Sequence, residues 1–98
     1  MKFPLTILTP AGPAFEGDAD AISITATDGS MGVLANHAPM IAAVTEGAGK
    51  ITVNGKDTWY ALGEGTLEVR PPQVLLLIDY AEAADSKADA VARAATTD

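Results

Sequence analysis

The stretch Ile51-Thr52-Val53-Asn54-Gly55-Lys56-Asp57-Thr58-Trp59-Tyr60-Ala61-Leu62 decides the fold class of this chain. Asn54-Gly55 at its centre is a strong β-hairpin signal, because both central residues of a type I′ turn need a positive φ that Asn and Gly tolerate. Ile51 and Val53 alternate with polar residues, which is typical of a strand with one buried face. The sequence therefore predicts a tight hairpin here.

The same period of two recurs outside the hairpin. Apolar and polar side chains alternate in Lys2–Ile7, Ala21–Thr27 and Thr66–Arg70. Val74–Ile78 has no alternation and is predicted to be a strand buried on both faces. Turn signals separate these segments at Pro10-Ala11-Gly12-Pro13, Gly17-Asp18, Asp28-Gly29, Gly63-Glu64-Gly65 and Pro71-Pro72. We expect an all-β fold, a small two-sheet β-sandwich or flattened barrel of about eight to ten short strands.

The composition changes near the C-terminus. Eight of the fifteen residues from Ala81 to Ala95 are alanine, and none is Gly or Pro, which favours a helix. Ser86 and Asp89 have the spacing of a capping pair. Val91 is the only large apolar residue, so this helix buries little. We expect a sandwich domain over residues 1–82 and a short, frayed, Ala-rich helical tail over residues 83–98.

Length and composition exclude several classes of function. The 98 residues suit a single domain, and the absence of cysteine excludes disulfides and thiolate metal sites. A single histidine excludes a multi-His site, so we expect no metal and no cofactor. Thirteen acidic and six basic residues give a net charge of −7, which argues against nucleic-acid binding. The longest strongly apolar run, Val74–Ile78, is far shorter than the roughly 20 residues of a membrane span.

Catalytic constellations are missing from the sequence. It contains neither a G-x-S-x-G elbow nor a phosphate-binding loop with Lys-Ser/Thr. Carboxylates gather at Glu16/Asp18/Asp20 and at Glu64/Glu68. We interpret them as solvated turn and edge residues, with a glycosidase-like acid/base pair as the alternative. His37 is interpreted as a loop residue with local hydrogen bonds, or alternatively as a protein contact, and Trp59 as a packing residue rather than a binding hot spot.

One segment carries a family resemblance. Gly29–Ile41 reads G-S-M-G-V-L-A-N-H-A-P-M-I and resembles the G-x-x-G-[VI]-x-P-G-H-A-P-L-L segment of the epsilon subunit of F-type ATP synthases. Further matching segments are Phe3–Pro10, Phe15-Glu16-Gly17, Glu46-Gly47, Gly63–Val69 and Ile78–Glu82. The resemblance spans Phe3 to Glu82, over four-fifths of the chain. Its specific part is the H-A-P box followed by G-x-L-E-V.

The resemblance implies a noncatalytic rotor subunit of a proton- or sodium-translocating ATP synthase. Such a subunit couples the gamma subunit to the membrane c-ring at the cytoplasmic face of the bacterial plasma membrane. By position, the gamma interface falls on His37, Met40 and Ala42. The c-ring interface falls on Asp28, Gly29, Ser30 and Met31. The alternative function is a free-standing sandwich that binds a small ligand in a pocket near Trp59.

Four departures from the family pattern are visible. Ala35-Asn36 replace the usual Pro-Gly, and Asn36 can still adopt the left-handed conformation. Ser30 stands where family members often carry an acidic residue. The family continues into an inhibitory two-helix hairpin, whereas this sequence ends at Asp98. We expect a short form without hairpin-based inhibition, with a truncated sequence as the alternative. The family's ATP-binding spacing of Asp and Arg is not matched, because Asp89 and Arg93 are four apart.

Overall fold

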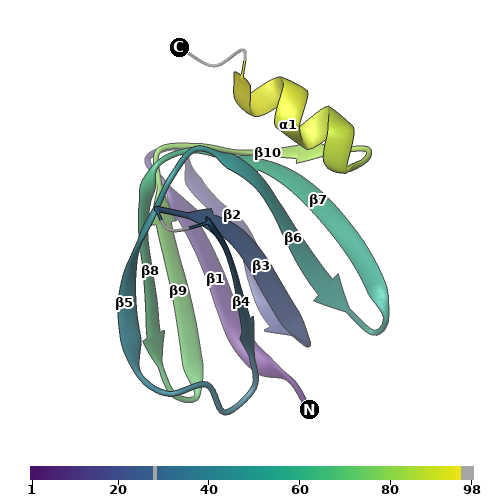
Figure 1. Ribbon diagram of the computed structural model, residues 1–98. Coiled ribbons are helices and arrows are strands. Elements are labelled where there is room, and N and C mark those ends of the chain that lie inside the picture. Colours follow the sequence, from purple (N-terminus) through teal and green to yellow (C-terminus); the bar gives the residue numbers. More distant parts are fainter. Residues whose placement is uncertain (28, 96–98) are drawn as a thin grey trace.

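The Asn54-Gly55 hairpin joins two of the ten strands that the computed structural model describes within residues 1–27 and 29–95 (Figure 1). In chain order the elements are β1 (Phe3–Thr9), β2 (Gly12–Ala19), β3 (Ala21–Ala26), β4 (Gly29–Leu34), β5 (Met40–Val44), β6 (Gly47–Val53), β7 (Lys56–Leu62), β8 (Gly65–Arg70), β9 (Gln73–Ile78), β10 (Ala81–Ala84) and α1 (Lys87–Ala95). The predicted all-β class, with eight to ten strands and a short C-terminal helix, is confirmed.

The strands form two layers. The hydrogen-bonded order is β10-β7-β6-β3-β5-β8-β9-β1-β2, and β4 pairs with β3 outside this path. Strands β3 and β5 share one register pair, Ala26 with Val44, so the path divides there into a β4-β3-β6-β7-β10 layer and a β5-β8-β9-β1-β2 layer. Neighbouring strands are antiparallel except for β1 and β9, which are parallel and place Ile7 beside Leu76. The result is the nearly closed sandwich that the turn spacing predicts.

The core lies between the layers and consists of the apolar side chains that alternate with polar ones along the strands. Phe3, Leu5 and Ile7 of β1 are buried, as their period of two predicts. The remaining members of the core cluster are Ala19, Ile22, Ile24, Val33, Val44, Ile51, Leu62, Leu67, Val69, Val74, Leu76 and Ile78. Each buried large side chain contributes about 1.5–3 kcal/mol relative to an exposed one. This single core holds both layers together as one body.

The prediction for Val74–Ile78 is wrong in one respect. This segment is strand β9, but only Val74, Leu76 and Ile78 are buried, whereas Leu75 is half-buried and Leu77 is 37% exposed. The reason is that α1 packs against β6, β7 and β10, which belong to the other layer. The apolar run therefore provides one core face and one exposed apolar face.

Local backbone geometry follows the turn residues. Asn54 and Gly55 have φ values of 52° and 78°, which confirms the predicted type of hairpin turn. Asn36 has a φ of 66°, so the left-handed conformation expected at this departure from Pro-Gly is confirmed. Both asparagines are exposed, and their turns need no support from the core.

Helix α1 begins as the capping pair predicts. The Asp89 amide donates to the Ser86 hydroxyl at 3.1 Å, and the Asp85 amide donates to the Asp89 carboxylate at 2.9 Å. Ala90 and Ala94 are buried against the sandwich, while Val91 is 49% exposed. Small alanines allow the close approach that Figure 1 shows between α1 and the strands beside it.

Ion pairs add to the attachment of the helix. Arg93 Nε donates to Asp89 at 2.9 Å, and the Arg93 guanidinium also bonds Glu82 of β10. Hydrogen bonds from the Asp85 amide and from Arg93 lower the pKa of the Asp89 carboxyl. Ala83 and Ala84, which the sequence predicts to belong to the tail, pair with Tyr60 and Trp59 as part of β10.

Hydrogen bonds among Lys2, Asp20 and Asn54, here called the polar clamp, connect three segments near the N-terminus. Lys2 Nζ donates to Asp20 at 3.1 Å and to the Asn54 side-chain oxygen at 2.6 Å. The Asn54 amide donates to the same Asp20 carboxylate at 2.6 Å. The hydrogen bond from Lys2, followed by that from Asn54, lowers the pKa of Asp20. The clamp joins β1, the start of β3 and the β6–β7 hairpin.

Asp20→Asn is expected to flatten the acid dependence of stability. The folded pKa of Asp20 lies below its unfolded value near 3.9, so its stabilising effect is present above that value and is lost as the pH falls through the folded pKa. Thermal melts between about pH 6 and pH 2 measure this. The wild-type melting temperature should fall more steeply than that of Asp20→Asn. Asp18→Asn, an exposed carboxylate on β2, is the control, and equal slopes for both variants would contradict the expectation.

Candidate protein interface

Strands β4 and β5 each leave an open edge on the sandwich. Within the described residues, β4 pairs only with β3, and β5 pairs along its length with β8 but meets β3 at a single residue pair. An open edge exposes backbone N–H and C=O groups to a partner chain. Neither strand carries a charged residue. This side of the molecule is therefore suited to contact with another protein.

A shallow hollow of about 360 Å³ lies between these two strands. Its lining residues are Ala26, Thr27, Gly29, Ser30, Met31, Ile41, Ala42 and Ala43. The structure thus brings together three residues of the predicted c-ring interface (Gly29, Ser30 and Met31) with Ala42 of the predicted gamma interface. Asp28, the fourth predicted c-ring residue, lies outside the described residues. None of the described lining residues is ionisable, and most are apolar or small, so they can form shape-dependent apolar contacts with a partner.

The predicted gamma interface contains Met40 and Ala42 of β5, but the more exposed face of this strand is the other one. Met40 and Ala42 are half-buried, and Met40 packs against the core cluster. Ile41 is 72% exposed and Ala43 is exposed as well. The predicted gamma interface did not include Ile41, although its exposure makes it accessible to a partner. The signal was present, because a period of two counted from buried Val44 assigns Ile41 and Ala43 to the outer face.

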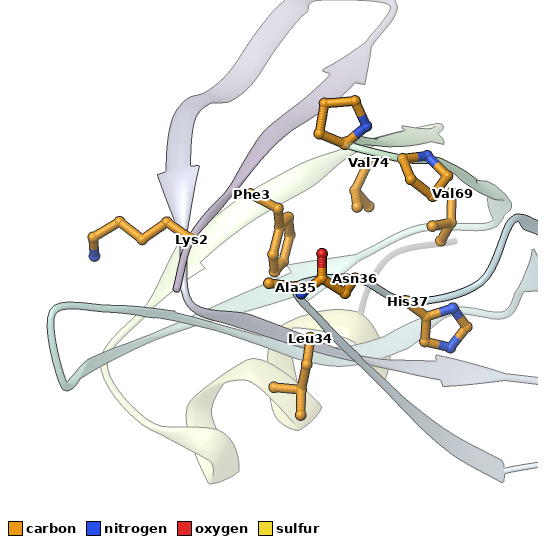
Figure 2. Close-up of a pocket in the computed structure, with 10 residues that line it drawn as sticks. Lys2, Phe3, Leu34, Ala35, Asn36, His37, Val69 and Val74 are labelled. Atoms are coloured by element: carbon orange, nitrogen blue, oxygen red, sulfur yellow. The ribbon is translucent and has the colours of Figure 1, made fainter.

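His37 lies at the far end of β5, in the loop that precedes it. It lines a hollow of about 130 Å³ together with Lys2, Phe3, Leu34, Ala35, Asn36, Val69, Pro71, Pro72 and Val74 (Figure 2). Its Nδ1–H donates to the Ala38 carbonyl at 2.7 Å, in line with the local hydrogen bonding predicted for it. Figure 2 shows the Lys2 and His37 side chains extending to opposite sides of the hollow. Its polar groups therefore do not converge on a small polar ligand.

The chemistry-bearing residues outside this surface are engaged or dispersed. Glu68 pairs with Arg70 at 2.6 Å, and Glu64 is exposed. Within residues 1–27 and 29–95, no group of three His, Cys, Asp or Glu side chains is arranged to hold a metal ion. No helix in this part of the chain has the length and apolar character to cross a membrane.

Trp59 is half-buried, and its ring lies 5.7 Å from Lys50 Nζ. The alternative prediction of a small-ligand site required a deep pocket beside this residue. Trp59 lines neither the β4–β5 hollow nor the hollow beside His37. The arrangement is that of a surface cation–π contact.

Comparisons with known proteins give a consistent picture. Residues 2–84 match the family "ATP synthase, Delta/Epsilon chain, beta-sandwich domain". The chain is 38% identical over 81 residues to the ATP synthase epsilon chain of Bacillus pumilus, covering 83% of this chain and 62% of the relative. It is 38% identical over 82 residues to that of Bacillus velezensis, covering 84% and 62%. The chain therefore spans about three-fifths of the length of these curated relatives.

Solved structures share the fold. One is a chain of the Euglena gracilis mitochondrial ATP synthase (OSCP/F1/c-ring, rotational state 1), with a TM-score of 0.79, 24% identity, and coverage of 84% of this chain and 53% of that one. Another is a chain of the Tetrahymena thermophila mitochondrial ATP synthase central stalk and c-ring, with a TM-score of 0.71, 15% identity, and coverage of 83% and 66%. Because the family match extends over nearly all of the sandwich, this chain belongs to the ATP synthase delta/epsilon family, as its β-sandwich domain.

Proposed function

We propose that this chain is a noncatalytic central-stalk subunit of a proton- or sodium-translocating F-type ATP synthase, where it links the gamma subunit to the c-ring. The observation that carries the proposal is the hollow at the open β4–β5 side, which brings Gly29–Met31 together with Ala42 in a member of this family. The relatives are named ATP synthase epsilon chains, and similar folds occur in structures of the central stalk and c-ring. The subunit acts at the cytoplasmic face of the bacterial membrane, held there by the complex.

The arrangement of β5 supports a division of this surface between two partners. The strand runs from the His37 loop at one end to Val44, which pairs with Ala26 beside the β3–β4 turn. Gamma lies along β5, against His37, Met40, Ala42 and the outward Ile41. The ring lies at the turn, against Asp28, Gly29, Ser30 and Met31. Because the two contacts sit on one packed core, a displacement at one is transmitted to the other.

Ile41→Glu is expected to weaken gamma binding by about tenfold or more, because a carboxylate would be desolvated in an apolar contact. Ile41 is 72% exposed in the isolated chain, so the fold should tolerate the change. Calorimetric titration with purified gamma subunit from the same organism measures the affinity. Val91→Glu on α1, also an exposed apolar residue, is the matched control and should bind as the wild type does. A folded wild-type chain that does not bind gamma at micromolar concentration would contradict the proposed function.

A further inference from the structure

At one end of the sandwich, the described residues of the strand connections include acidic side chains and no basic one. The β1–β2, β3–β4, β5–β6, β7–β8 and β9–β10 connections meet there. The register pairs that bring them together are Thr9–Gly12, Ala26–Gly29, Ala26–Val44, Val44–Gly65 and Gly65–Ile78. We call this the turn end; in Figure 1 the N-terminus lies at the opposite end. Within the described residues its connections contain Glu46, Glu64 and Asp79 and no Lys or Arg.

The acidic side chains at the turn end are not equivalent. Glu46 accepts a hydrogen bond from the Tyr80 hydroxyl at 2.9 Å. Glu64 and Asp79 are exposed, and the contact between their segments is a backbone one, in which the Asp79 amide donates to the Glu64 carbonyl at 3.0 Å. The two segments are thus adjacent in the fold, and both exposed carboxylates are accessible to a positively charged partner.

An apolar hollow of about 390 Å³ opens beside these two carboxylates. Its lining residues are Leu8, Thr9, Pro10, Glu64, Gly65, Leu77, Ile78 and Asp79. Leu8 and Leu77 are register partners in the parallel β1–β9 pair and are 38% and 37% exposed. The hollow lies on the outer face of β9, which the unbroken apolar run predicts to be buried. It combines an apolar floor with an acidic rim.

We propose that this hollow receives an apolar side chain from a basic loop of the ring-forming membrane subunit, with Glu64 and Asp79 contacting a Lys or Arg beside it. The proposal rests on the proposed function and adds a second ring contact to the one at Gly29–Met31. Charge complementarity points to a cationic segment, because the rim holds two carboxylates and no base. The hollow also lies at the same end of the molecule as Gly29–Met31. A second copy of this chain does not fit, because two molecules of net charge −7 would bring acidic rims together.

The test uses the purified complex of this chain with gamma, and detergent-solubilised c-ring from the same organism as the probe. The double variant Glu64→Lys/Asp79→Lys is expected to bind the ring about tenfold or more weakly at low salt, with the difference shrinking as salt is raised. Leu8→Gln removes apolar floor without changing charge, and should cause a loss of about fivefold that salt does not alter. Glu16→Lys/Asp18→Lys on β2 makes the same change in charge away from the turn end and is the matched control.

The outcomes separate this inference from the function on which it rests. Ring affinities of both hollow variants within about twofold of the control would overturn the ring contact and leave the proposed function intact. Loss of gamma binding in the same variants would assign the hollow to gamma and also overturn it. A wild-type chain that binds neither gamma nor the ring would refute both. Calorimetric unfolding of each variant shows whether a loss of affinity reflects loss of fold.

Discussion

Gly65→Ala is expected to destabilise the sandwich by about 3 kcal/mol or more. A Cβ atom at this position would lie 1.8 Å from the Leu77 carbonyl oxygen and 2.7 Å from the Ile78 Cα. Both are backbone atoms of β9, so no side-chain rotation relieves the overlap. The overlap is relieved only if β8 moves away from β9 at the Gly65–Ile78 pair. Because Gly65 also pairs with Val44, this movement disturbs the contact of β8 with β5. The substitution therefore strains the layer that carries the proposed interfaces.

Urea unfolding followed by Trp59 fluorescence measures this loss. Gly32→Ala is the matched control, because its new Cβ would come no closer than 3.9 Å to the Ile22 carbonyl oxygen on the neighbouring strand. We expect the control to change the free energy of unfolding by less than about 1 kcal/mol. Equal stabilities for Gly65→Ala and Gly32→Ala would show that β8 and β9 are not packed as closely as described.

Leu76→Ala is expected to cost about 2–5 kcal/mol of stability, whereas Leu77→Ala costs less than about 1 kcal/mol. Leu76 is fully buried between the layers beside Ile7, so its truncation leaves a cavity in the core. Leu77 points to the outer face and is 37% exposed, so water replaces most of its lost contacts. The two substitutions remove the same atoms from adjacent residues of one strand.

This pair tests the arrangement of β9 directly. A strand buried on both faces, as the sequence suggested for Val74–Ile78, would make both substitutions costly. Denaturant midpoints of the two variants at the same pH, each compared with wild type, decide between the arrangements. Similar large losses would mean that the outer face of β9 is covered, which would also remove the hollow proposed for the ring contact.

Sequence alone determined the features that depend on neighbours in the chain. Asn54-Gly55 and Asn36 fix their turns because few residue types tolerate a positive φ, and this preference acts locally. Ser86 and Asp89 fix the start of α1 because a helix leaves its first amides without intrahelical partners. Alternation in the strands identified Phe3, Leu5 and Ile7 as core residues, because successive side chains of a strand point to opposite faces.

The tertiary structure decided which faces of the strands are covered by another layer or by the helix. A run of apolar residues such as Val74–Ile78 has the same pattern whether one or two layers pack against it. Because α1 packs on the other layer, Leu75 is only half-buried and Leu77 is exposed. The resemblance located the segment of the candidate interface, but the tertiary structure was needed to show that Val44 is buried, which turns Ile41 outward, and that Gly29–Met31 share a hollow with Ala42. Glu64 and Asp79 are fifteen residues apart in sequence and meet only through the antiparallel β8–β9 pair. Contacts of this kind join distant parts of the chain, so no local preference of a residue encodes them.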